Sequence, residues 1–538
     1  MSHPSHPVIP APVRFDGGAG RFAVRPDTRI AFTAPEVAPI VERFCSEIRR
    51  RTGLRLTPMA GHPGPAEPSV RIELAAGDEL GVLPAPLGIS PSGDGPPDER
   101  HSLTVAAGQI VLRAAEPVGV ARGLTTLLQL LAATPAADAD QTPLPAGRIL
   151  DAPRYAWRGL SLDLARSFFT VGEIRRVIDL LELYKLNVLH LHLTDDQGWR
   201  LPSGRPPTGR LPSGREPGAA CYSDTDLRAL VGYAADRFVT VVPEVDTPGH
   251  ASALVRMHPE LNTGRNEVSW ELPPGHRHRA VWLDPELPAT FTLVQNVLAG
   301  LAEIFPSPYI HIGGDEPYGM PHDLYASYVE RVRGLVRSIG KRPLGWQESA
   351  RAGLGPDDII QYWFSGIELA ASVPAEVRAK MDADLAMARR DVEAAAAASV
   401  PVIVSPQSHC YLDVPYAEPP ADPAQADRHG RVGLRLYAPM TVAQSFGWEP
   451  AGALGSGRAA QVAGVEAAIW AETISDFADL SFLLLPRLPG VAHQAWTDPK
   501  AVTWADHRDR LARHGRLWAQ DGLEYFRSSA IGWLPASP

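Results

Sequence analysis

Between residues 157 and 470, short apolar runs alternate with longer amphipathic stretches. Apolar residues at helical spacing fill most of the intervals, as in 171–183 and 324–339. Strands that alternate with helices predict a parallel sheet, and eight such strands favour a closed (β/α)8 TIM barrel. An open, doubly wound sheet is the structural alternative. The expected strands are 159–164, 187–193, 238–245, 309–313, 343–346, 359–363, 400–404 and 465–470.

The first 150 residues show a different pattern and predict a small α/β domain, followed by a barrel domain over 151–538. Strand-like runs occur at 30–32, 70–74 and 109–112, and helical spacing covers 118–131. The Pro-, Gly- and Ser-rich stretch 84–97 is expected to be a loop, and 135–145 a linker. No pattern in this region indicates chemistry.

Charge and composition narrow the class of protein. The chain of 538 residues has a formal net charge of −10, which argues against binding to nucleic acid or to an anionic membrane surface. Its three cysteines form no CxxC pair, so neither a disulfide framework nor a cysteine zinc site is expected. Neither a secretory signal pattern nor an apolar run of spanning length is seen. We expect a cytoplasmic protein, or a secreted one if its natural beginning lies elsewhere.

Polar and aromatic residues gather where the expected strands end. Active sites of TIM barrels lie at the C-terminal ends of the strands, so these side chains are expected to meet. One such Trp usually packs in the core and one such Asp usually caps a helix, but their joint placement favours a site. Carboxylates, an Arg and several aromatic rings at one barrel end suit a sugar. The set comprises Arg166, Asp195, Asp196, Glu244, Asp246, His250, Asp315, Glu316, Trp346, Trp363, Tyr411, Asp413, Trp470 and Glu472.

The segment 311–316, His-Ile-Gly-Gly-Asp-Glu, resembles the His-x-Gly-Gly-Asp-Glu signature of family 20 β-N-acetylhexosaminidases. The segments 162–169, 191–200 and 243–250 also resemble motifs of that family, and the later Trp, Tyr and Asp positions follow in its order. The resemblance spans roughly residues 150 to 530 and does not rest on one motif.

The resemblance implies an exo-acting, retaining glycosidase that removes terminal β-linked N-acetylhexosamine with the help of the substrate's own 2-acetamido group. It implies a small carbohydrate as partner and no cofactor or metal. Glu316 would be the general acid and then the base, Asp315 would hold the acetamido N–H, and Tyr411 its carbonyl. Arg166, Asp413 and Glu472 would bind sugar hydroxyls. Trp346, Trp363 and Trp470 would enclose the acetamido methyl group and the sugar ring. Asp195 and His250 would support Glu316.

Several features depart from the family pattern. Tyr437 stands where the family often has a Trp that faces the leaving group, and the segments 366–399 and 415–433 are longer than usual. The stretch 202–217 is rich in Pro and Gly and is expected to be a mobile loop. The choice between GlcNAc and GalNAc, the linkage and the oligomeric state stay open at this level.

Two other classes compete with this interpretation. A metal-dependent barrel hydrolase could use His190, His192, His250, His311 and Asp195, since neutral His and carboxylate suit zinc. However, the first two lie mid-strand, where they are expected to point at the core or the helices. An inert carbohydrate-binding barrel would keep the Trp walls, but it would not need Glu316, Asp315 and Tyr411.

Overall fold

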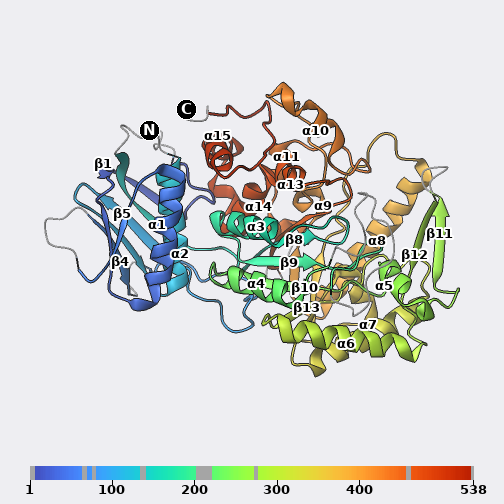
Figure 1. Cartoon of the computed structure of the whole chain (residues 1–538). Coiled ribbons are helices and arrows are strands. Elements are labelled where there is room, and N and C mark those ends of the chain that lie inside the picture. Colours follow the sequence, from blue (N-terminus) through green and yellow to red (C-terminus); the bar gives the residue numbers. More distant parts are fainter. Residues whose placement is uncertain are drawn as a thin grey trace.

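A computed structural model of the chain describes residues 6–62, 69–75, 80–133, 141–201, 221–271, 277–455 and 462–534. It consists of an N-terminal α/β sandwich packed against a closed barrel (Figure 1). The expected (β/α)8 barrel with a small preceding α/β domain is therefore confirmed. The expected loop 202–217 lies outside the described residues.

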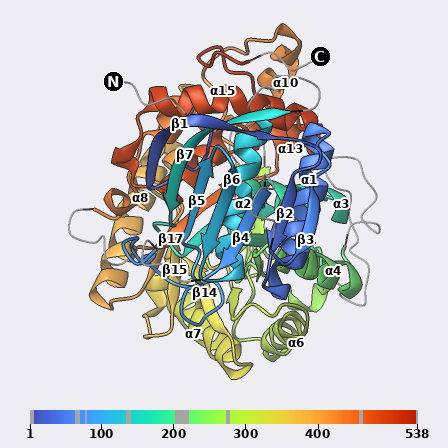
Figure 2. The ribbon, with the colours of Figure 1, turned by 90° about the vertical axis from the view of Figure 1, so that its left-hand side faces the viewer.

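The N-terminal domain is a seven-stranded sheet in the order β1-β7-β5-β6-β4-β2-β3. Its two helices cover the face turned toward the barrel, while the other face is turned away from it (Figure 2). The elements are β1 (Arg14–Val24), β2 (Arg29–Phe32), α1 (Ala38–Thr52), β3 (Thr57–Ala60), β4 (Ser69–Leu74), β5 (His101–Ala106), β6 (Gln109–Ala114), α2 (Pro117–Ala132) and β7 (Thr142–Asp151).

The prediction of a linker over 135–145 is wrong for its last residues. Residues from Thr142 onward belong to β7, which pairs antiparallel with both β1 and β5. Pro143 and Pro145 face β1, and Pro is compatible with such a pairing where no ladder hydrogen bond is needed from its nitrogen. The prolines therefore misled the sequence interpretation, and the preceding residues 134–140 lie outside the described part.

The barrel closes in the order β10-β13-β14-β15-β16-β17-β8-β9 with parallel pairing throughout. All eight expected strands are present, with ends shifted by a few residues. They are β8 (Trp157–Asp163), β9 (Val188–His192), β10 (Thr240–Glu244), β13 (Tyr309–His311), β14 (Arg342–Trp346), β15 (Ile359–Tyr362), β16 (Val402–Val404) and β17 (Val462–Ile469).

Helices surround the barrel, and several have N-terminal caps that the sequence encodes. Thr170 and Glu173 form a capping box at the start of α3, and Ser223 with Asp226 does the same for α4. The longer helices are α3 (Val171–Leu183), α4 (Asp224–Ala235), α6 (Pro288–Ile304), α7 (His322–Ser338), α8 (Ala375–Ala397), α13 (Phe477–Leu484), α14 (Arg487–Trp496) and α15 (Trp504–Gln520).

Shorter elements lie in the loops that follow the strands. After β14 the chain forms only the 3-10 helix η4 (Gln347–Ala352) before β15. The segment 366–399 contains α8, and 415–433 contains a short helix, so both longer segments have regular structure. The short elements are α5 (Ser252–Met257), the hairpin β11 (Glu267–Glu271) and β12 (Arg277–Val281), α9 (Gln407–Cys410), α10 (Ala426–Arg431), α11 (Val442–Phe446) and α12 (Pro450–Ala453).

The expected loop 84–97 closes the end of the barrel opposite the strand C-termini. Ile89 packs against side chains from the first residues of the barrel strands, including Trp157 and Tyr309. The Ile89 N–H donates to the Ala463 carbonyl at 2.9 Å, and the Tyr309 hydroxyl donates to the Ser90 carbonyl at 2.8 Å. One end of the barrel is thereby sealed, and the other remains for a site.

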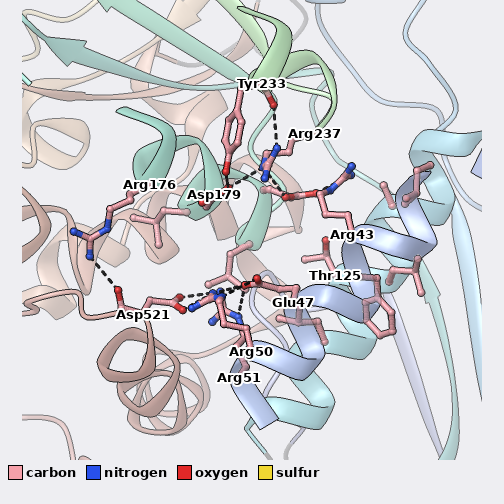
Figure 3. Close-up of a pocket in the computed structure, with 18 of the residues that line it drawn as sticks. Arg43, Glu47, Arg50, Arg51, Thr125, Arg176, Asp179, Tyr233, Arg237 and Asp521 are labelled. Atoms are coloured by element: carbon pink, nitrogen blue, oxygen red, sulfur yellow. Dashed lines mark hydrogen bonds and ion pairs between the residues drawn. The ribbon is translucent and has the colours of Figure 1, made fainter. Parts of the chain in front are cut away.

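A cavity of about 360 Å³ lies where the two domains meet (Figure 3). It is lined by α1 and α2 on one side and by α3 and α4 on the other. Ion pairs cross it: Arg51 pairs with Asp521 at 2.8 Å, and Arg43 with Glu182 at 3.2 Å. Because nearly every charge in it has a partner, this cavity is a polar interface between the domains and lies away from the strand C-termini.

No helix in the described part of the chain is long and apolar enough to cross a membrane. Residence in the cytoplasm stays a prediction.

Candidate active site

Asp315 and Glu316 lie in the segment that leads from β13 to α7. Gly313 has a φ of +70°, and a Cβ there would lie 1.7 Å from an oxygen of Asp246. The N–H of Gly314 donates to the same Asp246 oxygen at 3.3 Å. Glu316 itself has a φ of +45°, a left-handed conformation that costs a non-glycine residue about 1–3 kcal/mol and is typical of functional sites. The glycines let this segment bend sharply and bring both carboxyl groups to the barrel end.

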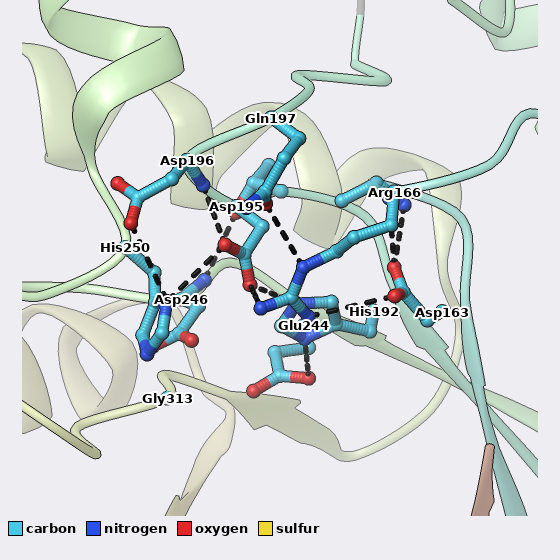
Figure 4. Close-up of polar contacts among 12 residues, drawn as sticks. Asp163, Arg166, His192, Asp195, Asp196, Gln197, Glu244, Asp246, His250 and Gly313 are labelled. Atoms are coloured by element: carbon cyan, nitrogen blue, oxygen red, sulfur yellow. Dashed lines mark hydrogen bonds and ion pairs between the residues drawn. The ribbon is translucent and has the colours of Figure 1, made fainter. Parts of the chain in front are cut away.

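His250 connects these two carboxyl groups to Asp195 and the network around it; Figure 4 shows His250 beside Asp195. Its Nδ1 lies 3.1 Å from Asp195, and its Nε2 lies 3.5 Å from Asp315 and 3.7 Å from Glu316. Burial disfavours the charged imidazole, but the carboxylates of Asp195, Asp246 and Asp315 outweigh burial and raise its pKa well above the usual value. We therefore expect a protonated His250 that places a positive charge beside both candidate catalytic groups.

The two adjacent carboxyl groups differ in environment. Partial burial and the nearby charge of Asp315 raise the pKa of Glu316, which favours its protonated form. Asp315 is buried, and its Oδ1 has no hydrogen-bond partner among the described residues. A buried acceptor without a partner is costly unless a ligand supplies a donor. The pair therefore offers one acid that can donate a proton and one acceptor for a substrate N–H.

Asp195 is held by donors on all sides. Its Oδ2 accepts from Arg166 at 2.8 Å and from His192 at 2.9 Å, and its Oδ1 accepts from the Asp196 N–H at 2.6 Å and from His250 (Figure 4). Although burial acts in the opposite direction, these partners hold the pKa of Asp195 well below its usual range. Asp195 is thus a fixed negative charge that orients His250 and Arg166.

A second polar layer lies deeper in the barrel. Glu244 accepts hydrogen bonds from His192 at 2.6 Å and from the Trp346 indole at 2.8 Å, and pairs with His190 and His311 at 3.0 Å. His190 also contacts Glu466 at 2.9 Å. Both histidines are buried in the barrel interior, but only His190 lies mid-strand as expected. His192 is the last residue of β9 and contacts Asp195 at 2.9 Å, so it also reaches the site. This layer supports the site from below and fixes the ring of Trp346.

Aromatic rings from four strand ends form one wall. Trp363 stacks on Tyr411 with ring centroids 6.1 Å apart and an interplanar angle of 7°. Trp470 meets the edge of Tyr411 at 5.9 Å and lies 6.0 Å from Trp346. Tyr437 is buried in the same aromatic cluster. Closely packed rings at a barrel end suit the apolar methyl and ring faces of an acetamido sugar.

Charged groups line the other side of the site. The Arg166 guanidinium lies 5.3 Å above the Trp470 ring and donates to Gln197 at 2.9 Å. Asp413 is buried, and no side chain among the described residues donates a hydrogen bond to its carboxyl oxygens. Burial and the nearby Glu472 raise the pKa of Asp413 to about 8. Binding of sugar hydroxyls by these groups stays a prediction.

The structure brings all eleven residues to which the family resemblance assigns a role to the same end of the barrel. Their individual roles stay predictions, because geometry alone does not test them. The residues are Arg166, Asp195, His250, Asp315, Glu316, Trp346, Trp363, Tyr411, Asp413, Trp470 and Glu472.

The sequence interpretation assigned no role to several residues that shape the site. Asp163 accepts from the N–H groups of Ala165 and Arg166 at 2.8 and 3.0 Å, and so fixes the arginine. Glu348 accepts from the Trp363 indole at 3.1 Å. Asp163 lies within a family-like segment, which could have indicated it. Glu348 follows a strand end by two residues, and only the packing of η4 shows what it contacts.

The described residues include four groups of His and carboxylate side chains whose potential ligand atoms lie within 4.8 Å of one another. These groups overlap the networks above. Charges of neighbouring carboxylates overcome burial and raise the pKa of His190 to about 9, and those of His192 and His250 well above the usual value. A protonated imidazole has no lone pair for a metal. His311 differs, because burial lowers its pKa and favours the neutral ring. The absence of a metal stays a prediction.

Comparisons with known proteins agree with this geometry. The family model described as "Glycosyl hydrolase family 20, catalytic domain" matches residues 155–320 and 318–499, and "Glycosyl hydrolase family 20, domain 2" matches 5–152. A β-N-acetylhexosaminidase of Cellulomonas fimi is 36% identical over 441 residues, which are 81% of this chain and 82% of that protein.

Two solved structures are similar over nearly their whole length. The GH20 β-N-acetylhexosaminidase of Streptomyces coelicolor superposes with a TM-score of 0.80 at 32% identity and covers 99% of each chain. The N-acetyl-β-hexosaminidase of Streptomyces plicatus in complex with Thio-NAglucal gives a TM-score of 0.79 at 31% identity, over 99% of this chain and 98% of that one.

Proposed function

The chain belongs to glycosyl hydrolase family 20 and has the activity of a β-N-acetylhexosaminidase, and on this basis we propose the mechanism and scope of its reaction. The proposed substrate is a terminal, non-reducing β-linked N-acetylhexosamine, either GlcNAc or GalNAc. The proposed nucleophile is the oxygen of the substrate's own 2-acetamido group. The observation that carries this proposal is the buried Asp315 oxygen without a partner, beside a Glu316 whose pKa is raised.

Substrate assistance sets specific tasks for the protein. As the acetamide oxygen attacks the anomeric carbon, the N–H of the acetamide becomes more acidic. The cyclic intermediate that forms gains positive charge. Asp315 accepts the N–H and stabilises that charge, and Tyr411 donates to the acetamide oxygen to hold it in place. A well-oriented intramolecular nucleophile gains from effective molarities of about 10⁵ M or more. The aromatic wall holds the acetamide in that orientation.

Glu316 handles the proton. In the first step it protonates the glycosidic oxygen, so that the leaving sugar departs as an alcohol. In the second step its carboxylate removes a proton from the water that attacks the anomeric carbon. This attack opens the ring that the acetamide formed with that carbon, and the sugar ring stays intact. The result is retention of configuration, because each step inverts the anomeric carbon once.

Most retaining glycosidases instead use a protein carboxylate as nucleophile, and family 20 is a known exception. The surroundings of Asp195 support the exception. Both of its oxygens accept short hydrogen bonds from four donors, so its lone pairs are occupied. This arrangement argues against Asp195 as a nucleophile and supports its role beneath His250.

Exo action follows from the groups that line the site. Arg166, Asp413 and Glu472 are proposed to bind hydroxyls of a terminal sugar. A polar group buried without its partner costs about 1–3 kcal/mol, so a chain continuing beyond that sugar is disfavoured. Release of monosaccharide from the non-reducing end of chitin oligomers, without early long internal fragments, is the expected product pattern.

The decisive experiment varies the nucleophile. Mono-, di- and trifluoroacetamido analogues of 4-nitrophenyl N-acetylglucosaminide withdraw electron density from the acetamide oxygen in steps. We expect kcat to fall steeply in that order, and a glucoside without the acetamide to be nearly inert. A flat series together with a sugar trapped on a protein carboxylate would identify a two-carboxylate mechanism instead. The matching galactosaminide, measured alongside, decides the sugar preference.

A further inference from the structure

Tyr318 lies two residues after Glu316, on the way to α7. Its side chain donates a hydrogen bond to the carboxyl group of Glu316, and its backbone N–H donates to the Glu316 carbonyl at 2.6 Å. The next residue, Gly319, has a φ of +74°, and a Cβ there would lie 2.4 Å from Val268 of the β11–β12 hairpin. The backbone that carries Tyr318 is therefore fixed from both sides.

Lys380 of α8 approaches Tyr318 from another part of the chain. Its Nζ lies 4.4 Å from the centroid of the Tyr318 ring and 2.7 Å from Asp384, one turn further along the helix. A cation over an aromatic face is attracted to the ring, and it draws electron density from the phenol. Tyr318 is thereby held in place beside Glu316.

The N-terminal half of α8 is anchored to the aromatic wall. Met381 and Leu385 pack against the buried cluster that contains Trp363, Tyr411 and Tyr437. The segment 366–399, which contains α8, thus delivers Lys380 to a defined place. Neither Tyr318 nor Lys380 belongs to the motifs on which the family resemblance rests.

We propose that Tyr318 is a positioning residue for Glu316, and that Lys380 on α8 secures Tyr318, so that together they hold the Glu316 carboxyl in the orientation needed for proton transfer to the leaving group. This inference rests on the proposed role of Glu316 as the acid and base. It assigns a task to α8 that no motif of the sequence indicates.

The charge balance around Glu316 shows what the pair would contribute. His250, Asp315, Tyr318, Lys380 and the hydroxyl of Tyr437 face its carboxyl group. Burial and Asp315 raise its pKa, whereas His250, Tyr318 and Lys380 lower it. The Tyr318 hydrogen bond favours the carboxylate that remains after the proton has moved. Its loss should weaken the acid and shift its titration upward in pH.

The test compares Tyr318→Phe and Lys380→Met with wild type over a range of pH. Substrates are 4-nitrophenyl N-acetylglucosaminide, whose leaving group needs little protonation, and chitobiose, whose leaving group needs it fully. For Tyr318→Phe we expect kcat on chitobiose to fall about tenfold or more, the loss typical of a hydrogen bond to a charged group. The nitrophenyl rate should fall less than threefold, KM should change little, and the alkaline limb of kcat/KM should move to higher pH. Lys380→Met should show the same pattern more weakly.

Matched controls separate this role from a general loss of structure. Tyr233→Phe also removes a tyrosine–carboxylate hydrogen bond, of 2.7 Å to Asp179, but at the domain interface. Lys500→Met removes a lysine charge far from the site. Both should keep the wild-type profile. Addition of Tyr318→Phe to Glu316→Gln should cause little further loss, because its effect runs through Glu316.

The outcomes are distinguishable. Equal losses on both substrates without a shift of the alkaline limb, or no loss at all in either variant, would overturn the positioning role. If the wild-type protein hydrolyses neither 4-nitrophenyl N-acetylglucosaminide nor the corresponding N-acetylgalactosaminide, the proposed function itself is wrong. Lys380 is exposed on α8, so Lys380→Met is expected to fold. It can therefore be assayed even if Tyr318→Phe does not fold.

Discussion

Asp315 and Glu316 are neighbours in the sequence, yet their carboxyl groups have different surroundings. Asp315 is buried, and one of its oxygens has no hydrogen-bond partner among the described residues. Glu316 is partly exposed, its backbone is in the left-handed conformation, and its pKa is raised. Two titratable groups in such contrasting environments can divide the roles of charged stabiliser and proton donor. At the residue scale, this difference carries the chemistry.

Replacement of either carboxyl group should therefore give a distinct kinetic signature. For Asp315→Asn we expect kcat to fall about 10²- to 10³-fold on every N-acetylhexosaminide, because stabilisation of the charged intermediate is lost. For Glu316→Gln we expect a loss of about 10²- to 10⁴-fold on chitobiose and a smaller one on 4-nitrophenyl substrates. Steady-state kinetics with both substrates measures this, with the exposed Asp323→Asn as control. Wild-type activity of either variant on chitobiose contradicts the assignment.

Asp413 links binding to stability. Its pKa is raised to about 8 in the folded chain, whereas the unfolded chain ionises with the ordinary aspartate value. As pH rises between these two values, the unfolded state gains stability by ionising while the folded state does not, so the folded protein becomes progressively less stable. Asp413→Asn cannot ionise and should escape this penalty.

We therefore expect Asp413→Asn to have a higher Tm than wild type above pH 8 and a similar Tm near pH 4. Its kcat/KM should nevertheless drop by about tenfold or more, since a hydroxyl acceptor is lost. Scanning calorimetry across pH measures the first effect. A Tm difference that is the same at both pH values would show that ionisation of Asp413 is not the cause.

At the element scale, the segment between β13 and α7 determines where the catalytic pair lies. Its conformation depends on a residue without a side chain at Gly313, where the backbone meets Asp246. The segment is also fixed from β14, whose Trp346 N–H donates to the Gly313 carbonyl at 2.9 Å. Neighbouring strands therefore hold the turn that the glycines allow.

Gly313→Ala is expected to displace this turn and lower kcat at least about 10²-fold, since small misplacements of catalytic groups are costly. Gly300→Ala is the matched control, because a Cβ at that position in α6 meets nothing within 4 Å. It should leave kcat unchanged and stabilise the helix slightly. Circular dichroism and kinetics of both variants give the comparison. If Gly313→Ala retains full activity, the close approach to Asp246 does not control the site.

At the scale of the whole molecule, the two domains are joined by a charged interface that the sequence did not reveal. Asp521 follows the last helix, α15, and pairs with Arg50 at 2.6 Å and with Arg51 at 2.8 Å on α1. The Arg51 side chain is only 4% exposed. Arg51 also pairs with Glu47 at 2.6 Å, so loss of Asp521 would leave this buried arginine with one of its two carboxylate partners.

Asp521→Ala should therefore destabilise the protein by about 1.5–3 kcal/mol, the range for a hydrogen bond to a charged group, with kcat little changed because the interface lies away from the barrel end. Asp509→Ala, which removes an exposed ion pair with Arg508, should cost less than about 1 kcal/mol. Urea unfolding followed by fluorescence measures the difference. Equal effects of the two variants would mean that the interface pair contributes no more than a surface pair.

Local patterns of the sequence determined much of this protein. Largely apolar runs indicated all eight barrel strands, because most residues of a parallel strand covered on both faces are apolar. The barrel rule then placed Arg166, Glu316 and Trp470 at one end without any knowledge of distances. The capping of α3 by Thr170 and Glu173 is likewise written in the chain.

Tertiary structure alone decided the rest, because contacts between distant segments have no local signature. The sequence could not show that Asp195 is enclosed by Arg166, His192 and His250, and it misjudged 142–145 as linker where pairing with β1 overrides the turn-forming residues. It also could not place Lys380 over Tyr318, since α8 reaches Glu316 only through packing on the aromatic wall. Residue types and their order fix which reaction is possible, whereas burial and neighbouring charges fix which carboxyl group holds the proton.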